Sequence, residues 1–242
     1  MDSTLLIVLI AFVAFAYAMV GHGGASGYLA IMALAGMSVV VMRPTALVLN
    51  LFVSAISFAQ YARSGHFKWS TFWPFAVLSM PAAWLGAHVV LDPVIYKRIL
   101  AVCLLFAVAR LFGFFGKGKD GLVPIPLFWG LLIGIALGFV SGMIGIGGGI
   151  LLSPVLLLFN WADMKTTAAT SALFIFVNSA AGMVGAFGNG ETLSTEMVPW
   201  IMAAVLGGLL GSWIGAKRLN ELRLKQALGL VLLFASVKLM LA

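Results

Sequence analysis

Two glycine clusters in apolar surroundings are the residues of this chain best suited to bind a ligand. They are Gly21-His22-Gly23-Gly24 and Gly145-Ile146-Gly147-Gly148-Gly149. Glycine permits a sharp backbone break and lets a ligand approach bare N–H groups. A helix that starts after such a break directs its free amides and its positive dipole end at the break. Close helix packing is the alternative role, but two clusters at matching places favour an anion cradle with backbone contacts from Gly23, Gly24, Gly147, Gly148 and Gly149.

Neutral polar side chains in two other apolar stretches are candidates to assist this cradle. Ser171 and Asn178 stand seven residues apart, which places them on one helical face two turns apart. Such groups donate hydrogen bonds to an oxyanion and leave the empty site uncharged, although they also join helices within bundles. The candidate substrate contacts of this kind are Asn50, Thr170, Ser171 and Asn178.

His22 is the only titratable side chain expected near the middle of the membrane. Its counterpart in the second cluster is Ile146, so a proton-linked role for His22 would belong to one half of the chain only. Acidic residues are absent from the interiors of the apolar stretches. A buried carboxylate is therefore excluded as a proton relay.

Enzyme signatures are scarce in this sequence. There is no H-E-x-x-H motif, no P-loop and no pair of carboxylates, and we expect no catalytic residue, metal or cofactor. One exception is Gly24-Ala25-Ser26-Gly27, which fits the G-x-S-G pattern of intramembrane serine proteases. A nucleophilic serine needs a histidine base, and the distant histidines, His66 and His88, fall at segment edges. A protease that uses Ser26 is kept as an alternative.

The composition requires elements that cross a membrane. Of 242 residues, 63% are hydrophobic and only 9% are charged, against roughly 25% charged in soluble domains. This excludes a cytosolic enzyme, a nucleic-acid-binding protein and a disordered chain. The apolar stretches are too long and uniform for barrel strands, so we predict an all-α polytopic membrane protein. The ten stretches are 4–20, 28–42, 44–62, 69–91, 99–115, 122–144, 148–160, 166–187, 197–216 and 226–242.

The chain reads as two duplicated halves of five stretches each. Besides the glycine clusters, Trp84-Leu85-Gly86-Ala87 matches Trp213-Ile214-Gly215-Ala216, which lies 129 residues later. Leu104-Leu105-Phe106-Ala107 likewise matches Leu232-Leu233-Phe234-Ala235, 128 residues later. We predict a first repeat over 1–116 and a second over 117–242, together forming one transport domain.

Length determines the topology of these repeats. Segments 4–42 and 122–160 each have 39 residues, about 58 Å as one helix, whereas the hydrocarbon core is about 30 Å thick. Each segment must cross twice or enter and fold back at its glycines. With three further crossings, each half reverses sidedness. This gives inverted repeats with broken, re-entrant or crossing helices near the midplane, as in many secondary transporters.

The net charge of +7 indicates orientation rather than an anionic partner. Under this topology nine cations lie on one side, and three lie on the other: Arg43, Lys97 and Arg98. The positive-inside rule then places both termini outside, in what we expect to be a bacterial inner membrane. A parallel eight-span arrangement divides the same cations eight against four. The charges therefore hardly distinguish the two arrangements, and the lengths of segments 4–42 and 122–160 favour the inverted one.

These motifs resemble the sulfite exporter TauE/SafE family. The run Gly145-Ile146-Gly147-Gly148-Gly149-Ile150-Leu151-Leu152-Ser153-Pro154, followed by Thr170-Ser171 and Asn178-Ser179, resembles the second half of that family. The first cluster with Asn50 resembles its first half, although His22 and Ala25 depart from a fuller glycine run. The resemblance covers essentially the whole chain. It implies a permease, often an exporter, for sulfite, an organosulfonate or another small anion.

Together these features predict a secondary transporter that works by alternating access. No nucleotide-binding motif is present, so an ion gradient or the membrane potential must supply the energy. An anion channel would share the same site and remains an alternative beside the protease. The expected partners are a small anionic substrate and the lipid bilayer, without nucleic acid, and a homodimer is left open.

Overall fold

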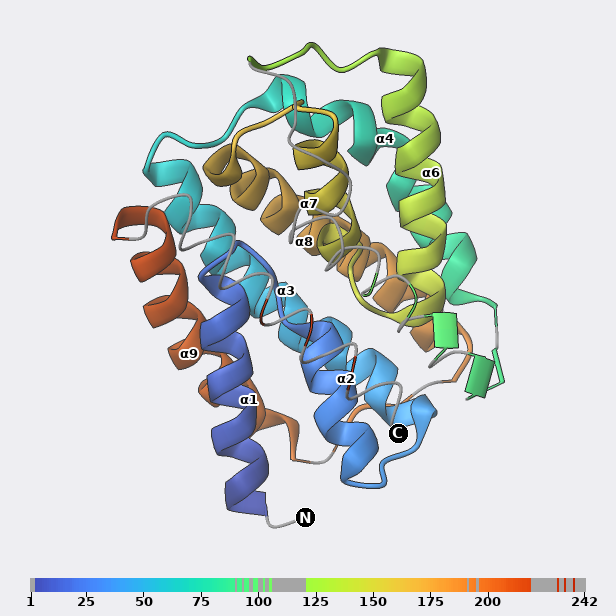
Figure 1. The fold of residues 1–242 in the computed structure, drawn as a ribbon. Helices are drawn as coiled ribbons and strands as arrows, with labels where there is room; N and C mark the ends of the chain where they lie inside the picture. The colour runs from blue at the N-terminus through green and yellow to red at the C-terminus, as the bar shows by residue number, and fades with distance from the viewer. Residues whose placement is uncertain are drawn as a thin grey trace.

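The computed structural model describes residues 3–89, 121–190, 192–194 and 196–218, with scattered positions between 91 and 105 and between 230 and 237. Over these residues the fold is all-helical, as predicted (Figure 1). Most of the stretches predicted at 99–115 and 226–242 lies outside the described residues. The described helices are α1 (Ser3–Ala18), α2 (Ala25–Leu34), α3 (Val39–Arg63), α4 (Trp69–Ala87), α6 (Leu127–Ile144), α7 (Gly149–Leu158), α8 (Met164–Gly188) and α9 (Met197–Lys217).

Four helices among the described residues are long and apolar enough to cross a membrane, namely α3, α6, α8 and α9. The outer helices also expose large apolar side chains, as a lipid environment requires, since lipid tails solvate such groups. These include Phe12 on α1, Val77 on α4, Phe128 on α6 and Leu206 on α9. The chain is an integral membrane protein.

Two helix pairs reverse direction at the glycine clusters. After the turn at 19–24, α2 runs back toward the end of the molecule where α1 begins, and α7 returns toward the start of α6 (Figure 1). The reversals use left-handed backbone, with φ of +97° at Gly24 and +75° at Gly148, which favours glycine. With 10 residues each, α2 and α7 measure about 15 Å. They are too short to cross the bilayer core.

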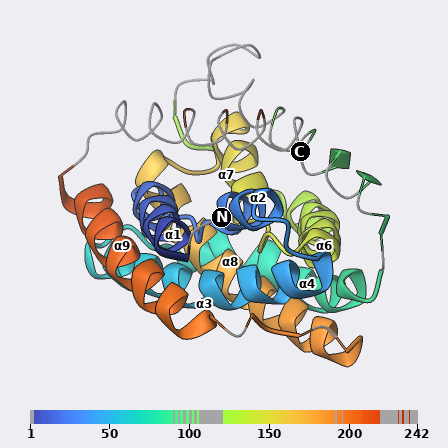
Figure 2. The same ribbon diagram turned by 90° about the horizontal axis from the view of Figure 1, so that it is seen from below.

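Glycine stripes hold the outer helices close to their neighbours. On α6, Gly130, Gly134, Gly138 and Gly142 recur every four residues, and a Cβ on each of the last three would meet the α4 backbone. On α9, a Cβ on Gly207 or Gly211 would meet the α1 backbone in the same way, and a Cβ on Gly215 would meet the carbonyl of Met19, directly after α1. Such small-residue spacing lets membrane helices approach closely. As a result α4 lies along α6, and α1 lies along α9 (Figures 1 and 2).

The predicted border between stretches 28–42 and 44–62 is wrong. Helix α3 already starts at Val39, so Arg43 lies inside a helix rather than in a loop, and it is only 4% exposed. Its guanidinium donates to the carbonyl oxygens of Ala87 (2.5 Å) and Met143 (3.3 Å). These carbonyls stand at the C-terminal ends of α4 and α6, where no intrahelical donor is available. They supply the partners that a buried cation needs.

Helix α8 begins with a side-chain cap that offers a stability test. The Asp163 carboxylate accepts hydrogen bonds from the amides of Lys165 (3.0 Å) and Thr166 (2.9 Å) and from the Thr166 hydroxyl (2.7 Å). Burial raises the pKa of Asp163, but these hydrogen bonds and the charge of Lys68 outweigh it and hold the pKa below its ordinary value near 3.8.

We expect Asp163→Ala to lower the free energy of unfolding by about 1 kcal/mol. Because the folded pKa is depressed, the charge-dependent part of this stabilisation is present above the unfolded pKa and is lost as the pH falls through the folded pKa. Thermal unfolding of the parent and of Asp163→Ala from pH 7 to pH 3 checks this. The difference between their Tm values should narrow below about pH 4. Asp163→Asn is the control, because asparagine also caps helices. Equal stability of Asp163→Ala and the parent at pH 7 would contradict the cap.

Candidate functional site

The two glycine clusters, residues 21–24 and 145–149, interrupt the helices and are called the first and second break. Both breaks contact Asn50, in the middle of α3. Its side-chain oxygen accepts a hydrogen bond from the amide of Ala25 (3.0 Å), the first residue of α2. Its side-chain nitrogen donates to the carbonyl of Ile146 (3.2 Å) in the second break and to the Ser179 hydroxyl (3.4 Å) on α8. Asn50 is fully buried. One side chain therefore joins both breaks to the two long central helices.

Glycine is required on both sides of Asn50 by close approach. A Cβ on Gly147 would lie 2.7 Å from the Ser179 hydroxyl and 2.9 Å from the Asn50 side-chain nitrogen. A Cβ on Gly23 would meet the Asn50 side-chain oxygen and would lie 3.1 Å from the Ile175 side chain. Contacts this short force a neighbour to move. The two breaks are thus adjacent, with Asn50 and Ile175 between them.

The cluster amides form a set of buried donors without acceptors. No hydrogen bond among the described residues has as its donor the amide of Gly23, Gly24, Gly147, Gly148 or Gly149. All five residues are buried, and the glycine caps of α2 and α7 provide no side-chain acceptor. Because buried N–H groups are normally paired, this concentration of unpaired donors at two helix N-termini suits an acceptor-only ligand.

His22 begins a hydrogen-bonded chain that links the first break to α7 and α8. Its Nε2 lies 2.8 Å from the Ser153 hydroxyl, and Ser153 lies 2.7 Å from the Ser171 hydroxyl. The other ring nitrogen of His22 is buried and has no partner among the described residues. The structure thus brings His22 and Ser171 together through Ser153.

Thr170 and Asn178 are buried on α8 but do not hydrogen-bond to the breaks in the described part of the chain. The Asn178 side-chain nitrogen donates to the carbonyl of Phe174 (2.8 Å), one turn earlier. Its side-chain oxygen and the Thr170 hydroxyl have no hydrogen-bond partner within the described ranges. Both groups therefore keep hydrogen-bonding capacity for a ligand or a changed conformation.

Ser26 has a tyrosine rather than a histidine as its partner. Its hydroxyl lies 2.8 Å from the Tyr17 hydroxyl, and the nearest histidine in sequence, His22, is bonded to Ser153. His88 bonds through its ring to the carbonyl of Trp84 (2.8 Å) at the end of α4. Among the described residues, the hydrogen-bond partner of the Ser26 hydroxyl is thus a tyrosine and not the histidine base that a serine nucleophile uses.

Three contributors to this region were absent from the sequence-based set, namely Ser153, Ser179 and Arg43. Ser153 bridges His22 and Ser171, and Ser179 is a hydrogen-bond partner of Asn50. A sequence signal existed for the two serines, because one lies in the run that follows the glycine triplet and the other follows Asn178. The signal for Arg43 was misleading, since a lone arginine between apolar stretches is typical of a loop.

Comparisons with known proteins agree on the kind of protein. The family model described as sulfite exporter TauE/SafE matches residues 6–239. The probable membrane transporter protein y4hK of Sinorhizobium fredii is 38% identical over 99% of this chain and 100% of its own length.

More distant similarity covers only parts of the chain. The probable membrane transporter protein YunE of Bacillus subtilis is 35% identical over 36% of this chain and 29% of its own length. The probable membrane transporter protein MJ0441 of Methanocaldococcus jannaschii is 25% identical over 54% of this chain and 50% of its own length. No solved structure matches. The family match and the full-length relative together show that this chain belongs to the sulfite exporter TauE/SafE family of membrane transporters.

Proposed function

We propose that this protein is a secondary transporter that carries a small oxyanion, such as sulfite or an organosulfonate, through a site formed by both glycine breaks. The observation that carries this proposal is the set of buried, unpaired amides on the two sides of Asn50. Gly23, Gly24, Gly147, Gly148 and Gly149 would contact the anion. Asn50, Thr170, Ser171 and Asn178 would assist, and His22 would be the proton-linked group. A site of this kind attracts an anion without a basic side chain.

Alternating access would arise from the relative motion of two inverted repeats, residues 1–116 and 117–242. The matched helix lengths support this division, with 10 residues in both α2 and α7 and 25 in both α3 and α8. The reciprocal packing of α4 on α6 and of α1 on α9 supports it too. The short α2 and α7 would be the re-entrant halves of broken helices.

Export is the direction favoured by energetics. We place both termini outside the inner membrane. Independently of that orientation, an anion that leaves a negative-inside cell releases about 2.3 kcal/mol of free energy per charge per 100 mV. Export therefore needs no coupling ion, whereas import of the same anion would need one. Protonation at His22 would supply such coupling.

Reconstitution into proteoliposomes tests this function. We expect flux of sulfite or a sulfonate above that of empty liposomes, saturation with substrate, and counterflow, which a carrier supports and a channel does not. Gly147→Leu should abolish the flux because its side chain would fill the space beside Asn50 and Ser179. Failure of sulfite, sulfonates and carboxylates to move above background, with Gly147→Leu equal to the parent, would refute the proposal.

A further inference from the structure

Two buried hydroxyl groups without hydrogen-bond partners lie against the glycines that precede α2 and α7. Tyr28 is 0% exposed and Ser141 is 1% exposed, and neither hydroxyl has a partner among the described residues. A Cβ on Gly24 would lie 2.8 Å from the Tyr28 hydroxyl oxygen. A Cβ on Gly148 would lie 3.3 Å from the Ser141 hydroxyl oxygen. Each break therefore has one unused hydroxyl at its final glycine.

The two hydroxyls occupy comparable places but come from different parts of the chain. Gly24 and Gly148 both cap a short helix with left-handed backbone and without a capping side chain. Tyr28 belongs to α2, the helix that Gly24 caps, whereas Ser141 belongs to α6, the helix before the second break. Two different side chains thus bring the same chemical group to the same point of each break.

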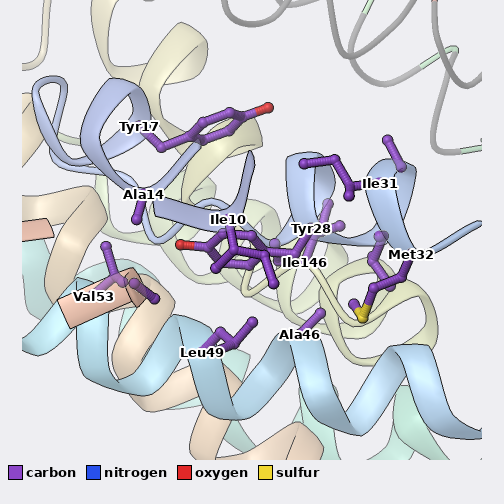
Figure 3. Close-up of a cluster of buried hydrophobic side chains, with 14 of the residues drawn as sticks. Ile10, Ala14, Tyr17, Tyr28, Ile31, Met32, Ala46, Leu49, Val53 and Ile146 are labelled. Carbon is purple, nitrogen blue, oxygen red and sulfur yellow. The ribbon is translucent and has the colours of Figure 1, made fainter. Parts of the chain in front are cut away.

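The Tyr28 hydroxyl has no hydrogen-bond partner among the described residues, and the Tyr17 hydroxyl of the same cluster is bonded to Ser26 instead. Tyr28 lies in the apolar cluster that also contains Ile10, Leu49 and Ile146 (Figure 3). These side chains offer neither donor nor acceptor. A buried hydroxyl that no protein group satisfies is unfavourable, and it points to a ligand that the fold accommodates.

We propose that the Tyr28 and Ser141 hydroxyls donate hydrogen bonds to the bound anion, one at each break. This inference rests on the proposed function and specifies its ligand class. A hydroxyl and an unpaired amide at each break together present donors from two sides, at Gly24 and at Gly148. The fitting ligand is an oxyanion with several oxygens, such as a sulfonate or sulfite, that accepts from both breaks at once. A monatomic halide presents no separate oxygens to the two breaks and binds more weakly.

Ligand-induced thermal stabilisation of the purified full-length protein tests this role. The variants are Tyr28→Phe and Ser141→Ala. The control is Ser57→Ala, which removes another buried hydroxyl, on α3, that has no partner among the described residues. The probes are sulfite, methanesulfonate and chloride at equal ionic strength, and Kd follows from the concentration dependence of the Tm. We expect each test variant to raise Kd for the two oxyanions at least about tenfold, as for a lost hydrogen bond to a charged group.

The ligand-free Tm separates binding from structure. Removal of an unpaired buried hydroxyl leaves that Tm unchanged or raises it, so stability and affinity should not fall together. Ser57→Ala should keep the parent's Kd. If oxyanions stabilise the parent and both test variants keep its Kd, the role of the two hydroxyls is overturned while the proposed function stands. A lower ligand-free Tm in both test variants would overturn that role in the same way. A parent that no anion stabilises would overturn the proposed function and this assignment with it.

Discussion

Replacing Gly142 by leucine is expected to destabilise the protein by about 3 kcal/mol or more. A Cβ on Gly142 would already overlap the backbone of Ala83 on α4, because it would lie only 2.8 Å from the Ala83 α-carbon. Backbone cannot rotate aside as a long side chain does, so the two helices must separate. That separation would also displace Ile144 and Gly145, where α6 ends and the second break begins. We therefore expect a large fall in Tm and loss of the monodisperse species in detergent.

Gly182→Ala is the matched control for this prediction. Gly182 lies on α8, and a Cβ there would have Gly142 as its nearest neighbour at 3.7 Å, an ordinary van der Waals distance. An alanine should fit and favour the helix slightly. Thermal unfolding and size-exclusion chromatography of both variants decide the matter. Equal behaviour of Gly142→Leu and the control would show that α4 and α6 are not in close backbone contact.

Asn50→Leu is expected to lower stability by several kcal/mol and to abolish transport. The substitution removes three hydrogen bonds and leaves the Ala25 amide and the Ile146 carbonyl buried without a partner. Each unsatisfied buried group costs about 1–3 kcal/mol. The loss is larger for function than for the fold, because both breaks lose the side chain that holds them together.

Ser54→Ala is the control for Asn50, since Ser54 is buried one turn further along α3 and its hydroxyl has no partner among the residues that the structure describes. It should keep the parent's Tm and flux. The Tm and the proteoliposome flux are measured on the same preparations. Parent-like flux by Asn50→Leu would exclude Asn50 as the joint between the breaks, whatever its Tm.

The sequence alone predicts the helical fold and the glycine breaks well, for physical reasons. Long uniform apolar runs have one solution in a bilayer, and clustered glycines in such runs leave few alternatives to a break. The chain reversals at Gly24 and Gly148 follow from segments too long for one crossing. Asn50 was identifiable because a buried amide in an apolar stretch needs partners.

The features of the candidate site that the sequence does not predict depend on contacts between residues far apart in the chain. His22 and Ser153 are 131 residues apart, and no local pattern specifies that pair. Arg43 was assigned to a loop because its charge is satisfied by carbonyls of α4 and α6 that become neighbours only in the fold. Tyr28 was missed because an aromatic residue in an apolar helix is typical of a core. The sequence also does not show that its buried hydroxyl has no hydrogen-bond partner in the described part of the chain.

The proposed function requires that the two breaks hold one and the same anion. Gly23 and Gly149 allow a matched test, because neither has a positive φ and each approaches the Ile175 side chain. A Cβ on Gly23 would meet the side chains of Asn50 and Ile175. A Cβ on Gly149 would meet the Ile175 side chain and the Ser171 carbonyl on α8, so alanine at either position crowds one break without imposing left-handed strain. Gly182→Ala serves again as the control.

Isothermal titration of the purified full-length protein with sulfite or methanesulfonate tests whether both breaks contact one anion. We predict one anion per chain for the parent and for Gly182→Ala. Gly23→Ala and Gly149→Ala, one from each half, should each weaken binding by at least about tenfold, or 1.4 kcal/mol. Two anions per chain, or loss of affinity in only one of the two break variants, would contradict a shared site.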